Sequence, residues 1–212
     1  MGKEGKPELG TAHSVTIPNF NEFWVVDKIH DIAIAPIAPI INHLQENQTT
    51  IFFKAIPRTF VPNEFQLRSL DAIEEVIFVG YPGGFYDERH FLPIVRKGIT
   101  ATPPYIDFNG WKAFLIDASV FPGSSGSPVF LYNRGSYFDK TTKSFIIGAE
   151  RLLFLGILSA VYHIPDTGEI IYASLSKMPK VKVRQLLDLG IVYKAELIVN
   201  LIEEFLKKRG EI

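Results

Sequence analysis

The residues best suited to chemistry form one short loop, Gly123-Ser124-Ser125-Gly126-Ser127. Two glycines around a serine let the backbone turn sharply, so that amide N–H groups can lie beside the hydroxyl. A serine nucleophile needs this arrangement, because hydrogen-bond donors must stabilise the negative charge that develops on the attacked carbonyl oxygen. Gly/Ser strings also occur in linkers. The apolar stretches on either side, FLIDASVF and PVFLY, argue against a linker and predict a loop between two strands.

Residues 116–130 resemble the Gly-x-Ser-Gly-x-Pro signature of trypsin-like serine peptidases. They are most similar to the bacterial high-temperature-requirement type, in which Asp-Ala precedes Pro-Gly-x-Ser-Gly. The resemblance implies that Ser125 is the nucleophile and that the N–H groups of Gly123 and Ser125 form the oxyanion hole. An α/β-hydrolase elbow is the rival interpretation, but it requires Gly-x-Ser-x-Gly followed by a helix. Here Ser127 replaces the second glycine and a strand-like stretch follows.

Two further segments extend this resemblance. Val79-Gly80-Tyr81-Pro82 is similar to the Gly-x-Pro that ends the first strand of the second barrel, and residues 155–160 are similar to the strand that pairs with the substrate backbone. The resemblance then implies a primary specificity pocket formed by Ser119, Ser159, Ala160 and Val161. Because β-branched Val161 stands where deep-pocket enzymes have glycine, the resemblance implies that this pocket prefers a small apolar side chain at the primary position of the substrate.

The general base is harder to identify than the nucleophile. Asp31, in His30-Asp31-Ile32-Ala33-Ile34, resembles the Asp-Ile-Ala of the family, which implies a carboxylate that orients a histidine. Thr11-Ala12-His13 resembles the Thr-Ala-x-His of the family but is one residue short, and residues 14–30 leave little room for the two strands expected there. We therefore expect the chain to lack the first half of the N-terminal barrel with its catalytic histidine, and to be nearly inactive.

The composition excludes several other classes of function. The chain has 212 residues, of which 47% are hydrophobic and 21% charged, and its formal net charge is -1, so we expect no nucleic-acid partner. No apolar stretch is long enough to span a membrane, and the polar N-terminus predicts no signal peptide. The absence of cysteine excludes disulfides and thiolate sites and favours a cytoplasmic location. No His/Asp/Glu cluster has metal-ligand spacing, so we expect no metal and no cofactor.

The pattern of apolar runs predicts a mainly β chain with a C-terminal helix. The expected strands cover 23–27, 32–40, 51–56, 74–80, 93–101, 112–117, 128–132, 152–161 and 169–175, and the helix covers 194–208. Residues 133–149 are polar and predict an excursion, which could be a hairpin. With the resemblance, this predicts a chymotrypsin-like double β-barrel: a partial N-terminal lobe over 1–70, a six-stranded barrel over 71–176, and a tail and helix over 177–212.

Three functional hypotheses follow. The first is a serine endopeptidase that cleaves peptide or protein substrates through an acyl-enzyme on Ser125. The second is a non-catalytic homologue that binds extended peptides by strand addition beside residues 157–161. The third is a fragment without function, because a half-barrel exposes strand edges.

Overall fold

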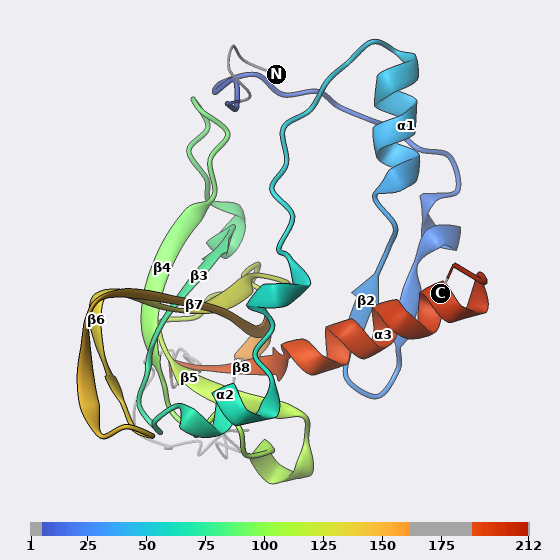
Figure 1. Cartoon of the computed structure of the whole chain (residues 1–212). Coiled ribbons are helices and arrows are strands. Elements are labelled where there is room, and N and C mark those ends of the chain that lie inside the picture. Colours follow the sequence, from blue (N-terminus) through green and yellow to red (C-terminus); the bar gives the residue numbers. More distant parts are fainter. Residues whose placement is uncertain (1–5, 162–187, 212) are drawn as a thin grey trace, which may run out of the picture.

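The computed structural model describes residues 6–161 and 188–211 and is mainly β, with a helix at the C-terminal end. Its centre is a closed antiparallel barrel of six strands in the order β3-β4-β5-β8-β7-β6 (Figure 1). The strands are β3 (Glu75–Gly80), β4 (Ile94–Thr100), β5 (Ala113–Asp117), β6 (Pro128–Asp139), β7 (Ser144–Val161) and β8 (Leu189–Lys194). Pairing of β3 with β6 closes the barrel.

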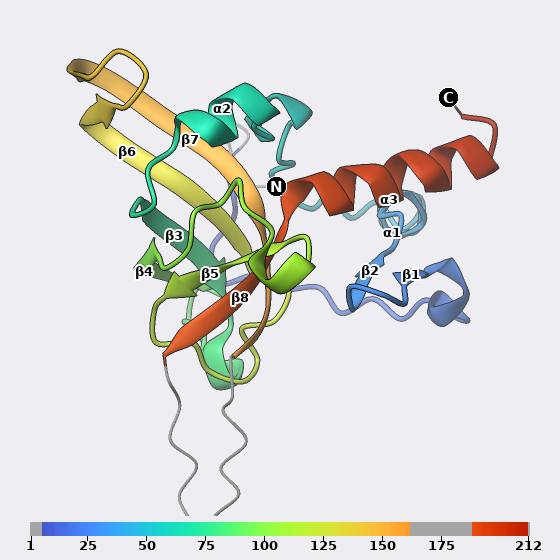
Figure 2. The ribbon, with the colours of Figure 1, turned by 90° about the horizontal axis from the view of Figure 1, so that it is seen from below.

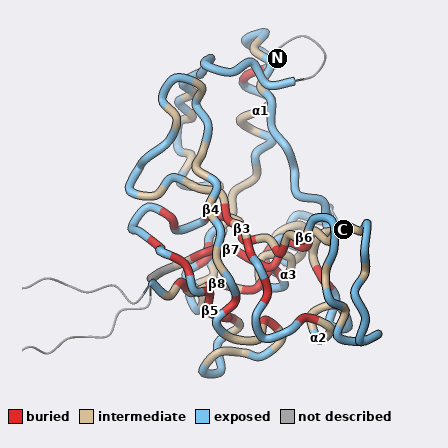
Figure 3. The backbone as a smooth tube through the Cα atoms, turned by 90° about the vertical axis from the view of Figure 1, so that its left-hand side faces the viewer, coloured by how far each residue is buried: buried red, intermediate tan, exposed pale blue. Residues whose placement is uncertain are grey.

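The barrel forms because its strands place apolar side chains inward. Val76 and Phe78 alternate along β3 and are almost fully buried, as expected for a strand with one face on the core. They join a single apolar cluster, the barrel core, whose members are Leu70, Val76, Phe78, Phe114, Ile116, Ala118, Val120, Val129, Leu131, Leu153, Leu155, Leu158 and Val192. Figure 3 shows the buried residues concentrated along the barrel strands.

The excursion predicted over 133–149 is a hairpin. β6 and β7 continue through it in antiparallel pairing from Pro128↔Ile157 to Asp139↔Ser144, with register shifts after Val129 and Gly135. Figure 2 shows these two strands extending well beyond the rest of the barrel. The strands predicted at 128–132 and 152–161 are therefore correct in place but too short.

The sixth barrel strand is not the one that the sequence predicted. β8 pairs with β5 and with β7 and so fills the last position of the barrel, whereas the predicted strand 169–175 lies outside the described residues. Ending the barrel at 176 is therefore wrong, since residues 189–194 belong to it. The alternation was concealed because the inward-facing positions of β8 are Gly190, Val192 and Lys194, of which only Val192 is a large apolar residue.

The N-terminal region, residues 6–60, contains little sheet. It has a 3₁₀ turn (η2, Phe20–Phe23), a two-stranded antiparallel sheet of β1 (Val25–Asp27) and β2 (Ile32–Ile34), and helix α1 (Ala38–Glu46). The strand predicted over 32–40 is wrong beyond Ile34, because Pro39 occupies the first turn of α1, where its missing N–H costs nothing. Residues 51–56, predicted as a strand, have no regular secondary structure.

The remaining elements either connect the two regions or lie in loops of the barrel. A 3₁₀ turn (η3, Arg58–Phe60) leads to α2 (Glu64–Ser69), which begins at a capping box between Asn63 and Gln66, and further 3₁₀ turns are η4 (Pro82–Gly84) and η5 (Phe108–Gly110). Helix α3 (Ala195–Lys208) continues directly from β8 and contacts β1 and β2, as Figures 1 and 2 show. The helix predicted over 194–208 is confirmed. Within the described residues, no helix combines the length and apolar character needed to cross a membrane.

Candidate functional site

The loop that carries Ser125 joins β5 to β6 and is fixed to β7 by main-chain hydrogen bonds. The N–H of Gly126 donates to the carbonyl of Leu158 at 2.7 Å, and the N–H of Leu158 donates to the carbonyl of Ser127 at 2.9 Å. Within the loop, the N–H of Ser127 donates to the carbonyl of Ser124 at 3.1 Å. These bonds hold the loop in one conformation beside β7.

Two glycines give this loop its shape. Gly123 and Gly126 have φ values of 87° and 84°, a conformation that residues with a side chain rarely adopt. A Cβ on Gly123 would also lie 3.1 Å from both the amide nitrogen of Gly83 and the carbonyl oxygen of Tyr81. The sequence therefore requires glycine at position 123 for conformation and for space.

The segment after β3 supports the loop from one side. The N–H of Gly83 donates to the carbonyl of Pro122 at 2.7 Å. Gly80 faces the side chain of Ser127 so closely that a Cβ on Gly80 would lie 1.9 Å from the Ser127 Oγ. The Gly80-Tyr81-Pro82 segment, the Ser125 loop and the strand through Leu158 are thus in direct contact, although they are distant in the sequence.

Ser125 and its neighbour Ser124 differ sharply in environment. Ser125 is exposed, and its hydroxyl donates to the carbonyl oxygen of Ser159 at 2.5 Å. Ser124 is 1% exposed, and its Oγ has no hydrogen-bond partner. Of these two serines, Ser125 alone can therefore meet a substrate.

The amides assigned to the oxyanion hole are free to act as donors. The N–H of Gly123 and the N–H of Ser125 make no hydrogen bond to any other described residue, whereas their neighbours Ser124, Gly126 and Ser127 all donate to carbonyls. Unpaired main-chain donors at the surface of a fixed loop are available to a developing negative charge.

The histidines do not reach this hydroxyl in the described part of the chain. The Ser125 Oγ makes no hydrogen bond with a histidine nitrogen there. His13 lines a cavity together with Tyr81, and no residue of the Ser125 loop lines that cavity. His163 lies outside the described residues.

Asp31 is not positioned as the orienting carboxylate of a histidine. It is exposed at the turn between β1 and β2, with a φ of 51°, and its carboxylate makes no hydrogen bond with a histidine among the described residues. The neighbouring carboxylate does so instead: Asp27 Oδ2 lies 2.7 Å from His30 Nδ1, and this bond lowers the pKa of Asp27. His30 packs edge-on against Trp111 and Tyr193 and so joins the turn to the outside of the barrel.

A second aspartate–histidine pair of the same kind lies in the β3–β4 loop. Asp87 Oδ2 is 2.8 Å from His90 Nδ1, while Asp87 Oδ1 accepts the N–H groups of Arg89 and His90. The bond to His90 lowers the pKa of Asp87. Both pairs were missed from the sequence, although the repeated spacing Asp-x-x-His, in Asp27–His30 and Asp87–His90, is a signal that predicts this turn geometry.

The predicted specificity pocket is only partly visible. Ser159 is half-buried on β7 beside Ser125, and Ser119 is exposed between the buried Ala118 and Val120. The backbone of Ala160 and Val161 pairs with β8, but their side chains lie outside the described part.

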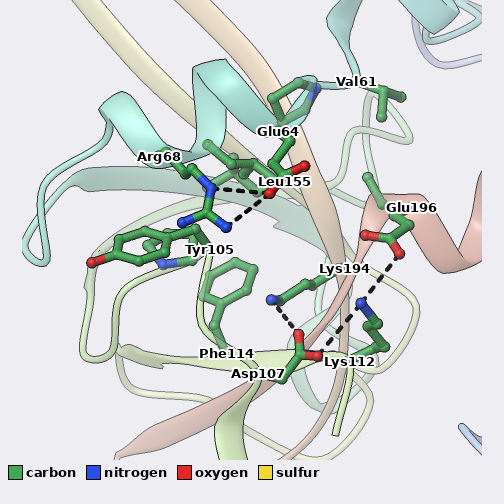
Figure 4. Close-up of a pocket in the computed structure, with 14 residues that line it drawn as sticks. Val61, Glu64, Arg68, Tyr105, Asp107, Lys112, Phe114, Leu155, Lys194 and Glu196 are labelled. Carbon is green, nitrogen blue, oxygen red and sulfur yellow. Dashed lines mark hydrogen bonds and ion pairs between the residues drawn. The ribbon is translucent and has the colours of Figure 1, made fainter. Parts of the chain in front are cut away.

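A separate pocket of about 480 Å³ lies at the opposite end of the barrel, beside the start of β5 and the end of β8 (Figure 4). Its charged groups are paired: Lys194 Nζ, which is buried, lies 2.6 Å from Asp107 Oδ1, and Lys112 contacts both Asp107 and Glu196 at 3.4 Å. The bond with Lys194 lowers the pKa of Asp107. Because every charge has a partner, this network fastens the β4–β5 loop to the start of α3. Among the described residues, no group of three or more acidic or histidine side chains could hold a metal ion.

Comparison with known proteins adds no relative to this picture. No protein-family model, no curated protein and no solved structure matches the chain.

Proposed function

We propose that this chain is a serine hydrolase of the trypsin-like peptidase type, in which Ser125 attacks the carbonyl carbon of a peptide bond. One observation carries the proposal: an exposed serine hydroxyl lies on a fixed loop whose Gly123 and Ser125 amides have no other partner among the described residues. Such donors stabilise an oxyanion most effectively when they are held in place before the reaction.

The surrounding fold supports the same proposal. The three segments that resemble the peptidase family, around Gly80, Ser125 and Leu158, come together at one end of a six-stranded antiparallel barrel. The Ser125 loop lies between the third and fourth of these strands, and the first strand ends at Gly80. A chymotrypsin-like barrel is therefore the architecture that we propose for residues 75–194.

In the proposed reaction, a bond forms between Ser125 Oγ and the carbonyl carbon, and the carbonyl oxygen becomes an oxyanion held by the two amides. Collapse of this intermediate breaks the carbon–nitrogen bond and releases the amine, and water then hydrolyses the acyl-enzyme. The hydroxyl proton needs an acceptor, but in the structure it points to the carbonyl of Ser159, which is not a base. Without an imidazole, loss of about a millionfold in turnover is expected.

A second function, peptide binding without cleavage, is favoured by the edge of β7. Its pairing with β6 ends at Pro128↔Ile157 and is followed only by the bonds of Leu158, so no described strand covers the β6-facing edge from Ser159 to Val161. The opposite edge of this segment pairs with β8. An extended peptide could add to this edge as a further strand. Both functions place a peptide in the same position, and they differ in whether Ser125 reacts.

The test is phosphonylation of the purified chain by an ethyl fluorophosphonate at mildly alkaline pH, followed by mass spectrometry of the intact protein and of its peptides. Because no imidazole contacts the Ser125 hydroxyl among the described residues, labelling should be slow, and it is measured with a large excess of reagent over a long incubation. We expect one adduct, located on Ser125, that is absent from Ser125→Ala and retained by Ser124→Ala, because the Ser124 hydroxyl is buried. An adduct that survives Ser125→Ala, or no adduct on the wild-type chain, would exclude Ser125 as the nucleophile and favour peptide binding alone.

A further inference from the structure

A cavity of about 610 Å³ lies where three segments distant in the sequence meet: residues 7–13, residues 50–54 and the β3–β4 loop. Figure 1 shows these segments side by side at the end of the molecule where the β3–β4 loop projects. Its lining includes the aromatic side chains of Phe52, Tyr81 and Phe91 and the basic side chains of His13, Lys54 and His90. A space of this size accommodates a bulky side chain together with part of the peptide backbone.

The cavity is linked to the Ser125 loop by the segment that begins at Tyr81. Tyr81 lines the cavity, and its carbonyl oxygen lies 3.1 Å from the position that a Cβ on Gly123 would occupy. Gly83, two residues further on, is hydrogen bonded to Pro122. One short segment, residues 81–83, therefore both lines the cavity and positions the Gly123 amide.

The aromatic side chains of this wall are exposed although they contact one another. Tyr81 packs against Tyr86 with ring centroids 6.1 Å apart, and Tyr86 stacks on Phe91 at 6.2 Å. Tyr81, Phe91 and Phe52 are each exposed over more than two-fifths of their area. Clustered exposed aromatic groups gain free energy when a ligand removes them from water.

The direction in which a substrate would run assigns the cavity to one side of the cleaved bond. Ser159 on β7 contacts the Ser125 hydroxyl on one flank, and the open edge of β7 continues from there. The Tyr81–Gly84 segment approaches the same loop at Gly123, a different point from the one that Ser159 contacts. A peptide that lies along β7 with its acyl part must therefore extend its leaving-group part toward Tyr81.

We propose that this cavity binds an aromatic or large apolar side chain of the substrate on the leaving-group side of the scissile bond. The inference rests on the proposed function, since it takes Ser125 as the reacting group. His90 adds a polar group to the lining, because the bond between its Nδ1 and Asp87 leaves Nε2 available for a hydrogen bond with a ligand. The cavity thus selects peptides by a residue after the cleaved bond as well as by one before it.

The test compares two phosphonates that place the same ethyl phosphonyl group on Ser125 but release different leaving groups. One is the fluorophosphonate, which releases fluoride, and the other is an ester that releases N-acetyl-tyrosinamide as its phenol. In both reactions the bond from Ser125 Oγ to phosphorus forms, the bond to the leaving group breaks, and the hydroxyl proton passes to solvent. The ratio of the two labelling rates reports only what the leaving group contacts.

We expect Phe91→Ala and Phe52→Ala, which change two separate walls, each to lower the ester-to-fluoride ratio by roughly tenfold while fluoride labelling stays unchanged. Phe138→Ala is the matched control, because Phe138 is 45% exposed, close to the 44% of Phe91, but lies near the far tip of the β6–β7 hairpin. Ratios that stay unchanged in both cavity variants, with Ser125 still labelled, would overturn the inference alone. Failure of the fluorophosphonate to label Ser125 would overturn the proposed function, and the inference with it.

Discussion

The barrel and the N-terminal region differ in how far they bury their apolar side chains. The barrel core joins residues from nearly every barrel strand, and most of its members are almost completely buried. Among residues 6–60, the buried hydrophobic side chains are only Ile32 and Leu44, while Trp24, Val26, Phe52 and Phe53 remain substantially exposed. The barrel can therefore hold the Ser125 loop rigidly. The N-terminal region instead contributes part of the lining of the cavity beside Tyr81.

The difference extends to the strand edges. Each barrel strand has a neighbour on both sides along at least part of its length because the barrel is closed, whereas β1 and β2 pair only with each other in the described chain. Open edges and few buried contacts make local opening cheaper. The Ser125 loop, which is hydrogen bonded to β7, benefits from the barrel, whereas the cavity beside Tyr81 also depends on residues 7–13 and 50–54.

The largest difference between the two regions should appear when one aromatic side chain in each is truncated to alanine and the free energy of unfolding is measured. Phe78→Ala removes a fully buried ring from the barrel core and should lower the free energy of unfolding by about 3–5 kcal/mol. Phe53→Ala, which changes an exposed ring in the N-terminal region, should change it by less than about 0.5 kcal/mol. Urea unfolding followed by circular dichroism measures both, and equal losses for the two variants would contradict the division.

The charged network at the other end of the barrel should give the next largest effect. Asp107→Asn leaves the buried Lys194 ammonium without its carboxylate and should cost about 2 kcal/mol at pH 7. Lys194→Met removes the nearer of the two cations that contact Asp107, so adding Asp107→Asn to it should cost less than Asp107→Asn costs in the wild type. A double-mutant cycle measured by urea unfolding tests this coupling, and strictly additive losses would contradict it.

This effect has a defined pH dependence. The pKa of Asp107 is lower in the folded chain than in the unfolded chain, so the pair stabilises the fold above the unfolded value of about 3.9. The stabilisation is lost as the pH falls through the folded pKa. The gap between wild type and Asp107→Asn should therefore be full near neutral pH and shrink below about pH 4.

The smallest effect should come from the contact that attaches the β1–β2 turn to the barrel. Asp27→Asn weakens the bond to His30 and should lower global stability by less than about 1 kcal/mol. It should nevertheless speed hydrogen exchange in residues 25–34 without changing β5 or β8. Asp87→Asn, which breaks the same type of pair in the β3–β4 loop, is the control and should leave exchange of β1 and β2 unchanged.

Much of the barrel could be predicted because its strands are apolar and end at glycine or proline. β3, β4 and β5 lie within a residue or two of their predicted bounds. β8 was missed because an inward-facing strand position normally carries an apolar residue, and Lys194 breaks that rule by pairing with Asp107. In the N-terminal region, the sequence pattern predicts that Pro39 interrupts a strand, whereas Pro39 lies in the first turn of α1.

The candidate site follows the same division. Ser125 and Gly123 were predicted from adjacent residues, because a loop motif fixes its own local geometry. Asp31 and a histidine belong to segments whose positions depend on tertiary contacts, which spacing alone does not determine. The structure instead pairs His30 with Asp27, since a carboxylate three residues earlier reaches Nδ1 and also accepts main-chain N–H groups within the same turn.

The most direct test of the proposed role of Ser125 is the rate of fluorophosphonate labelling in Gly123→Ala compared with Gly126→Ala. Both glycines have φ near 85°, so both variants carry similar backbone strain, but only at Gly123 would the new Cβ press on Gly83 and Tyr81. If the Gly123 amide helps to hold the oxyanion, labelling of Ser125 should fall by roughly 10²–10³ in Gly123→Ala and by no more than about tenfold in Gly126→Ala. Equal rates in the two variants, or labelling at a residue other than Ser125, would contradict the proposal.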